Sequence, residues 1–162
     1  DNGTWTYESS DQQRCRSLGP GISFCGASDI WKNTTSASPD AAATFRYDDR
    51  HYAMVIVEAL GAANGVTSEY MRSAVVENAA TGGDVALESV VVIGIESYEG
   101  FAYPSETVIY SMEVNGLNAV YANTIVTKLN QTFQLITFSV GNQYTQQHRQ
   151  LNDDFVKSFQ LD

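Results

Sequence analysis

The chain of 162 residues is 43% hydrophobic and carries 19 acidic against 9 basic residues, which gives a formal net charge of -10. This length and composition predict one globular domain spanning residues 1–162, and the negative charge disfavours binding to nucleic acid, whose phosphates attract Lys and Arg. No apolar run approaches the ~20 residues that cross a bilayer, so we expect no membrane span.

The two cysteines, Cys15 and Cys25, lie on either side of a Gly-Pro-Gly turn signal at residues 19–21, and the run ISFC after the turn alternates like a strand. Zinc sites need four ligands in close pairs and redox dithiols have C-x-x-C spacing, and neither pattern is present. We therefore predict a Cys15–Cys25 disulfide and an oxidising compartment; two free thiols in a cytosolic protein are the alternative. A start at Asp1 without methionine is compatible with a removed signal peptide and equally with a shortened chain. From the predicted disulfide we expect a secreted or periplasmic protein.

The segment before residue 60 predicts four strands. TWTY at residues 4–7 and GISF at 21–24 are strand-like, and residues 28–40 predict a polar loop in which Trp31 is an anchored aromatic. We expect residues 1–40 to form a disulfide-bracketed strand and loop extension of the domain. The runs AATFRY and HYAMVIVE then predict a hairpin around the acidic turn DDR.

A first helix is predicted after Thr67, which is a suitable N-cap residue. Gly82-Gly83 ends the helical pattern. One stripe of the helix recurs at helical spacing and consists of Tyr70, Met71, Ala74, Val75 and Ala79.

After this helix, four further strands are predicted, in the runs VALESVVVIGIESY, TVIYSMEV, LNAVYANTIVTKL and TFQLITFSV. Asn115-Gly116 is a strong signal for a two-residue hairpin turn. A second helix is predicted with Thr145 as its cap and with His148, Leu151, Phe155 and Phe159 on one stripe. The predicted fold class is α+β, a mostly antiparallel sheet covered by two amphipathic helices.

Three pieces of the chain between residues 43 and 162 carry a family resemblance: ATFRYDDRHYAMVIVE, YSMEVNGLNAVYANTIV and QLITFSVGNQYTQQHRQLNDDFVKSFQL. They resemble the PsbP-like superfamily, which joins the photosystem II PsbP proteins, the Ran-binding nucleotide-release factor and bacterial envelope proteins of the DcrB type. The resemblance covers about three quarters of the chain and leaves out the cysteine-bracketed segment. It implies an antiparallel sheet sandwiched by helices and a role as an adaptor or accessory subunit.

Motifs of the common enzyme classes are absent: the sequence has no G-x-S-x-G, H-E-x-x-H, P-loop or G-x-G-x-x-G. The cluster YDDRHY places Asp48 and Asp49 close to His51, and a carboxylate could orient that imidazole as a general base. An acidic, solvated turn has the same composition, and we favour that interpretation. His148 shares its stripe with Leu151, which is typical of a packed helix face. We expect no catalytic residue, no metal and no cofactor.

Aromatic side chains gather in SYEGFAYP, where Tyr98, Phe101 and Tyr103 lie within six residues. Aromatic residues on a turn-rich loop are common anchors of protein interfaces, and burial of the rings against the sheet edge is the alternative. With Trp31, they are our candidate interface residues.

We expect a non-enzymatic, extracytoplasmic accessory or adaptor protein that binds another protein or an envelope component, and the sequence leaves its oligomeric state open. One alternative is a small-molecule binding module with a pocket between sheet and helix. Another is a cytosolic chaperone or adaptor.

Overall fold

The computed structural model describes residues 15–34, 41–81, 90–114 and 116–162, and the predicted strand at residues 4–7 lies outside this part of the chain. Its helices are α2 (Ser68–Thr81), α3 (Gln146–Lys157) and the short 3-10 helix η1 (Ala62–Asn64). The strands are β1 (Arg16–Gly19), β2 (Ile22–Phe24), β3 (Lys32–Asn33), β4 (Ala41–Arg46), β5 (His51–Glu58), β6 (Val91–Ser97), β7 (Ser105–Val114), β8 (Leu117–Thr127), β9 (Thr132–Val140) and β10 (Phe159–Leu161). No helix in these ranges is long and apolar enough to cross a membrane.

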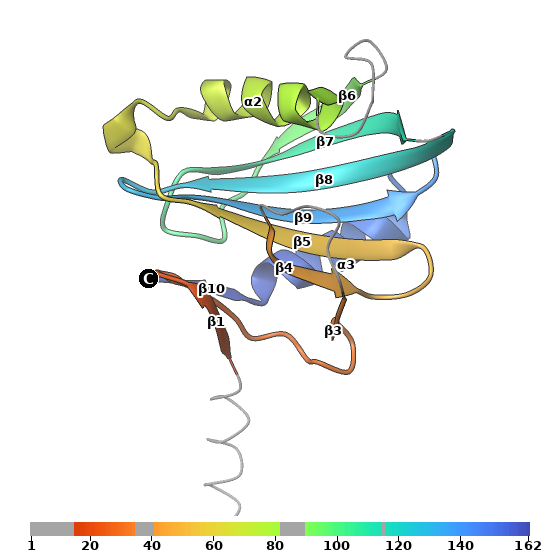
Figure 1. The fold of residues 1–162 in the computed structure, drawn as a ribbon, viewed down its shortest axis with the longest axis horizontal. Helices are drawn as coiled ribbons and strands as arrows, with labels where there is room; N and C mark the ends of the chain where they lie inside the picture. The colour runs from red at the N-terminus through yellow and green to blue at the C-terminus, as the bar shows by residue number, and fades with distance from the viewer. Residues whose placement is uncertain (1–14, 35–40, 82–89, 115) are drawn as a thin grey trace, which may run out of the picture.

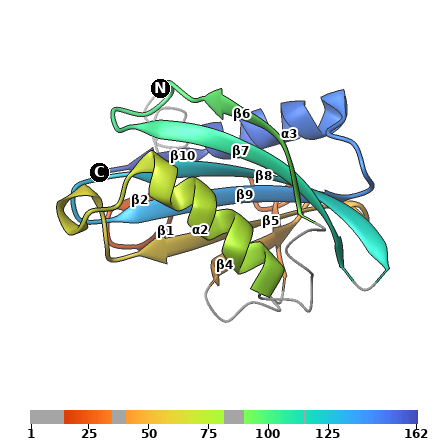
Figure 2. The same cartoon turned by 90° about the horizontal axis from the view of Figure 1, so that it is seen from above.

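Seven strands form one antiparallel sheet in the order β3-β4-β5-β9-β8-β7-β6, with α2 on one face and α3 on the other (Figure 1, Figure 2). A second sheet of β1, β2 and β10 lies on the α3 side. The structure therefore confirms the predicted α+β fold class, a mostly antiparallel sheet covered by two helices.

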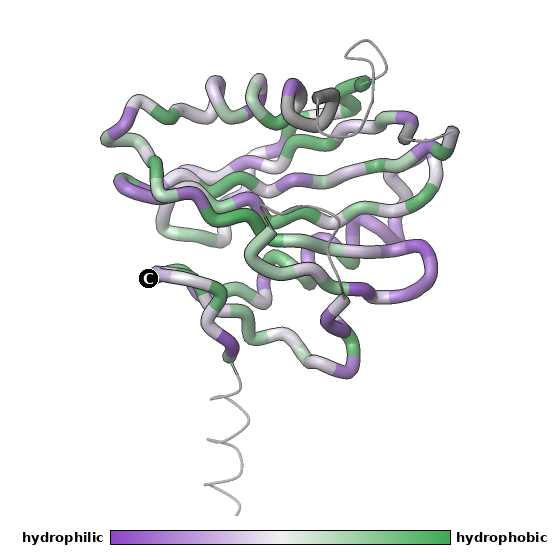
Figure 3. The backbone as a smooth tube through the Cα atoms, in the orientation of Figure 1, coloured by the Kyte–Doolittle hydropathy of each residue, from purple (hydrophilic) through white to green (hydrophobic). Residues whose placement is uncertain are grey.

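The two predicted hairpins are present. Val114 of β7 and Leu117 of β8 are partners, and Gly116 between them has the positive φ of +81° that favours glycine. β4 and β5 pair next to a turn in which the Tyr47 N–H donates to the His51 carbonyl at 2.9 Å. This β4–β5 turn is hydrophilic along its length (Figure 3).

Both predicted helix caps are confirmed. The Thr67 hydroxyl accepts a hydrogen bond from the Tyr70 N–H at 3.0 Å, and the Thr145 hydroxyl accepts one from the His148 N–H at 3.1 Å. These bonds satisfy backbone donors that a helix start leaves without an intrahelical partner.

The prediction of the buried helix stripes was wrong for two residues, Tyr70 and Phe159. Tyr70 is 60% exposed, because α2 turns its neighbour Met71 toward the sheet and adjacent residues are about 100° apart around a helix. Phe159 lies in β10 and not in the last helix, because α3 ends at Lys157 and the following residues pair with β2. Phe159 is buried all the same, against the same core as α3.

The largest core lies between α3 and the sheet, and the N-terminal segment is part of it. Ile22 and Phe24 of β2 and Trp31 of the following loop are buried there together with Phe155 of α3. The predicted disulfide is present between Cys15 and Cys25, whose Cα atoms lie 4.1 Å apart. It brackets the β1–β2 hairpin, so that β2 is held in place to fill this core.

Candidate functional site

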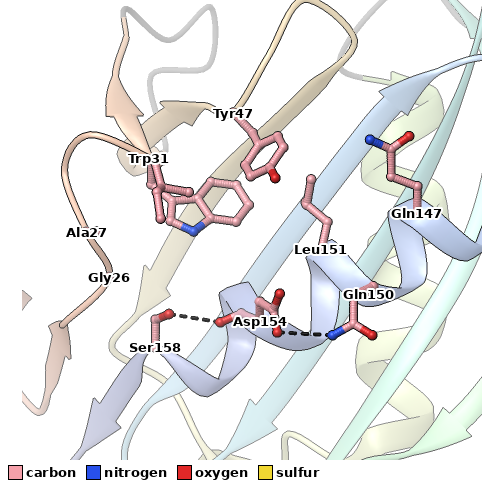
Figure 4. A pocket seen from close by; sticks show the side chains of 10 residues that line it. Gly26, Ala27, Trp31, Tyr47, Gln147, Gln150, Leu151, Asp154 and Ser158 are labelled. Carbon is pink, nitrogen blue, oxygen red and sulfur yellow. Dashed lines mark hydrogen bonds between the residues drawn. The ribbon is translucent and has the colours of Figure 1, made fainter.

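A cavity of about 460 Å³ opens between α3 and the loop that follows β2 (Figure 4). We call it the Trp31 groove. It is lined by Gly26, Ala27, Ile30, Trp31, Tyr47, Gln147, Gln150, Leu151, Asp154 and Ser158.

The apolar wall of the groove is held by the core behind it. A turn in which the N–H groups of Ile30 and Trp31 both donate to the Ala27 carbonyl directs the indole inward. The Trp31 ring lies 4.8 Å from Phe155 and 5.2 Å from Tyr47, centroid to centroid, and only 5% of the residue is exposed. These contacts hold the Trp31 ring in place as the aromatic wall of the groove.

The polar side of the groove comes from α3. The Gln150 amide donates to the Asp154 carboxylate at 3.2 Å, and the Ser158 hydroxyl donates to the Asp154 carbonyl at 2.8 Å (Figure 4). Asp154 is exposed, so its carboxylate can accept a further hydrogen bond or pair with a cation. Histidine, cysteine and lysine do not occur among the lining residues. The arrangement is suited to binding an apolar group with a neighbouring donor.

A smaller pocket of about 260 Å³ adjoins the groove through Gln147 and has His51 and Ser139 in its lining. His51 is 5% exposed, and its Nδ1 lies 2.8 Å from the Asp48 carboxylate, which also accepts the His51 N–H at 2.8 Å. Burial alone would raise the pKa of Asp48, but hydrogen bonds from the Arg50 N–H and from His51 lower it below its ordinary value. The solvated-turn interpretation was therefore wrong for His51, because β5 begins at this residue and turns the ring inward.

His148 is fully buried, as its place on a packed helix face predicts. Its Nε2 lies 3.0 Å from the Thr137 hydroxyl and its Nδ1 lies 3.2 Å from the Ser139 hydroxyl. Burial, and next the nearby His51, lower the pKa of His148 to about 4. The ring is thus neutral at pH 7, and both of its nitrogens have hydrogen-bonding partners.

Metal-ligating side chains do not gather in the described residues: no group of three or more His, Cys, Asp and Glu is placed to hold an ion.

The predicted aromatic loop lies apart from the Trp31 groove. Tyr98, Phe101 and Tyr103 are half-buried and pack against the main core, with the rings of Tyr98 and Phe101 5.3 Å apart. Burial raises the pKa of Tyr98, and Asp153 of α3 adds to this effect. None of these three residues lines the groove, whereas the fourth candidate, Trp31, does. The structure therefore divides the predicted candidate interface between two places.

Sequence reasoning missed the partners of Trp31 in the groove. Gln150 and Asp154 are spaced four residues apart and so lie on one side of the helix, beside the apolar stripe. That spacing is a usable signal. Tyr47, however, follows β4, far from α3 in the sequence, and no local pattern indicates that its ring meets Trp31.

Comparison with known proteins supports the fold. No protein-family model and no curated protein matches the sequence. The solution structure of cyanobacterial PsbP (CyanoP) from Synechocystis sp. PCC 6803 is similar with a TM-score of 0.58 and 18% identity, over 88% of this chain and 87% of that one. LpqN, which is involved in cell envelope biogenesis of Mycobacterium tuberculosis, is similar with a TM-score of 0.52 and 14% identity, over 86% and 82%. PA94 of Pseudomonas aeruginosa, a protein of unknown function, is similar with a TM-score of 0.53 and 7% identity, over 79% and 78%. At these identities the likeness concerns the architecture, and the chain has the PsbP-like fold that the sequence resemblance predicts.

Proposed function

We propose that this chain is a non-enzymatic, extracytoplasmic accessory protein that binds another protein or an envelope component in the Trp31 groove. The observation that carries the proposal is the aromatic wall of the groove. Two apolar side chains at its rim are exposed, Ile30 at 48% and Tyr47 at 38%. Interfaces gain most of their affinity where one partner inserts a large apolar side chain into such a desolvated pocket.

The location outside the cytoplasm is supported by the Cys15–Cys25 disulfide, because disulfides persist in oxidising compartments. The structural neighbour LpqN, which acts in cell envelope biogenesis, is consistent with this assignment.

The absence of catalysis is part of the proposal. A nucleophile needs a base within hydrogen-bond reach and a third group that orients the base. Ser139 does contact His148, but the second nitrogen of His148 is engaged by Thr137, and the lowered pKa of about 4 makes this ring a poor proton acceptor at pH 7.

The experiment compares two surface variants with equal changes. Ile30 is 48% exposed at the groove and Ile95 is 49% exposed on β6, so Ile30→Lys and Ile95→Lys replace similar side chains at different places. The parent chain and both variants, each bearing an affinity tag, are incubated with extract of the source organism, cross-linked and analysed by quantitative mass spectrometry. We expect a component that is depleted about tenfold or more with Ile30→Lys and retained with Ile95→Lys. A component retained equally by both variants, or no specific component at all, would contradict binding in the groove.

The volume of the groove favours a small ligand as the second candidate. A cavity of about 460 Å³ lies within the range of roughly 300 to 1,000 Å³ typical of ligand pockets. Native mass spectrometry of the protein purified from its source tests this directly. A bound small molecule that is lost with Ile30→Lys would identify a ligand-binding module.

A further inference from the structure

β6 is the last strand of the seven-stranded sheet, and within the described part of the chain no strand pairs with its outer edge. Four of its aliphatic side chains are 45% to 55% exposed, namely Val91, Val92, Ile93 and Ile95. Alternate residues of an edge strand also direct unpaired N–H and C=O groups outward. The edge combines free backbone hydrogen-bonding groups with an apolar surface.

The opposite edge of the sheet shows what a protected edge is like. β3 has only two residues, Lys32 and Asn33, both exposed and polar, and Arg16 donates to the Asn33 side chain at 2.7 Å. Short length and charge are the usual protection of an edge strand against further pairing. β6 is longer, at seven residues, and lacks Lys and Pro.

The protection that β6 does have is slight. One β-bulge interrupts its pairing with β7 between Val92 and Gly94. Its single charged residue, Glu96, accepts hydrogen bonds from Arg149 at 2.9 and 3.0 Å. The carboxylate of Glu96 is therefore paired within the chain.

Gly94 lies at this bulge, where a glycine is common in a strand. A Cβ atom placed on Gly94 would meet nothing within 4 Å, so the space beside the strand at this point is open within the described structure.

The charges around β6 indicate the chemistry of that chain. Glu99 follows the end of β6, and Glu113 lies on β7 just beyond the residues paired with the start of β6. Both are exposed, and no cation of the described residues pairs with either. Nearby cations are already engaged, Arg72 with Glu106 and Arg149 with Glu96. The edge is therefore apolar in the middle and negative at both ends.

We infer that the β6 edge binds an extended segment of a partner protein, apolar in its middle and basic at its two ends, which adds one antiparallel strand to the sheet. Main-chain hydrogen bonds along the strand supply affinity, and the apolar side chains and terminal charges supply specificity. A second copy of this chain fits less well, because each copy carries a net charge of -10. This surface is distinct from the Trp31 groove.

The test uses a synthetic, end-capped peptide Lys-Val-Thr-Val-Thr-Val-Lys and amide NMR of the full chain. We expect shift changes confined to β6 and its neighbour β7, and slower hydrogen exchange of the outward N–H groups of β6 by about tenfold or more. Ile95→Lys weakens the affinity by about tenfold or more, because it removes apolar contact and repels the basic ends. Ile30→Lys is the matched control and leaves the affinity within about twofold.

Two control peptides separate the contributions of charge and backbone. Replacing both terminal Lys by Glu weakens binding by about tenfold or more at low salt. N-methylation of every second residue removes the donors of one peptide edge, and equal binding of this peptide would refute strand addition. No binding of the Lys-ended peptide at about 1 mM would refute the proposal as well. A dimer that light scattering detects in the parent chain and that is lost in Ile95→Lys would assign the edge to a second copy. That result too would refute the proposal that a different protein binds there.

Failure of these peptide experiments leaves the Trp31 groove unaffected, because the groove is judged by the components that Ile30→Lys depletes, and Ile95→Lys serves there only as a control.

Discussion

On the α3 face of the sheet, rings from distant parts of the chain meet around Phe155. Its ring centroid lies between 4.8 and 5.9 Å from four others, those of Phe24, Trp31, Phe45 and Phe159. These residues come from β2, the following loop, β4 and β10, so one side chain joins the beginning and the end of the described fold.

On the α2 face, by contrast, aromatic rings stack in a row across four neighbouring strands. Centroid distances along the row are 5.6, 5.1 and 5.3 Å, in the order Tyr52, Phe138, Tyr121 and Tyr110. Tyr110 alone is buried, and burial raises the pKa of its hydroxyl. The other three rings are half-buried, and α2 packs mainly against β7 and β8, away from Tyr52 on β5 and Phe138 on β9.

The difference shows that similar residues stabilise the fold in two ways. The cluster around Phe155 fixes segments that backbone pairing of the main sheet does not join. The row on the α2 face reinforces strands that are already hydrogen-bonded to each other. The same substitution should therefore reduce the free energy of unfolding more on the α3 face than on the α2 face.

The largest effect is expected for Phe155→Ala. Loss of a fully buried ring with four aromatic neighbours should reduce the free energy of unfolding by about 3 to 5 kcal/mol. Urea unfolding of the variant beside the parent chain measures this. An unshifted midpoint would mean that α3 is a detachable recognition helix and that the α3 face is not the stable one.

Acidification should reduce the free energy of unfolding somewhat less than Phe155→Ala does, through the protonation of His148. The pKa of His148 is about 4 in the folded chain against an ordinary value of about 6.5, so the unfolded state binds more protons between these two pH values. The contribution of the neutral His148 ring to the free energy of unfolding is therefore fully present above pH 6.5. The free energy of unfolding falls by about 3 kcal/mol as the pH decreases to 4.

Urea unfolding at pH 7, 6, 5 and 4 follows this loss, with His148→Gln as the control that lacks the titrating ring. Parallel curves for the parent and the control would show that His148 does not titrate differently in the two states.

The smallest effect is expected for Phe138→Ala, in the middle of the row on the α2 face. A half-buried ring with two stacked neighbours should contribute about 2 kcal/mol, from partial burial and the two ring contacts. Urea unfolding gives the free energy, and near-ultraviolet circular dichroism should lose the signal of the coupled tyrosines. A loss equal to that of Phe155→Ala would remove the proposed difference between the faces.

Local signals in the sequence predicted the parts of the fold that depend on local interactions. The caps Thr67 and Thr145, the turn conformation of Gly116 and the paired cysteines each need only residues close in the chain. Helical periodicity also found Leu151 and Phe155, because one buried face repeats every three to four residues.

The remaining features depend on which segments meet, and sequence periodicity does not encode that. Phe159 continues the helical spacing of α3, yet β2 offers its backbone a strand partner, and pairing ends the helix. The run of aliphatic residues in β6 is typical of a strand covered on both faces, but β6 lies at the edge and is exposed. The Trp31 groove likewise required contact between a loop and a helix more than 100 residues away.

The position of β2 between β1 and β10 has a consequence for the order of folding during synthesis. β1 and β2 are adjacent in sequence, so their hairpin can form as soon as residue 25 has been synthesised, and its disulfide can form once the two cysteines meet an oxidant. The other edge of β2 stays open until residues 159–161 exist, since the Cys25 N–H donates to the Ser158 carbonyl and the Asp162 N–H to the Gly21 carbonyl. During that interval the apolar side chains of β2 lack their final cover and are open to proteases and chaperones.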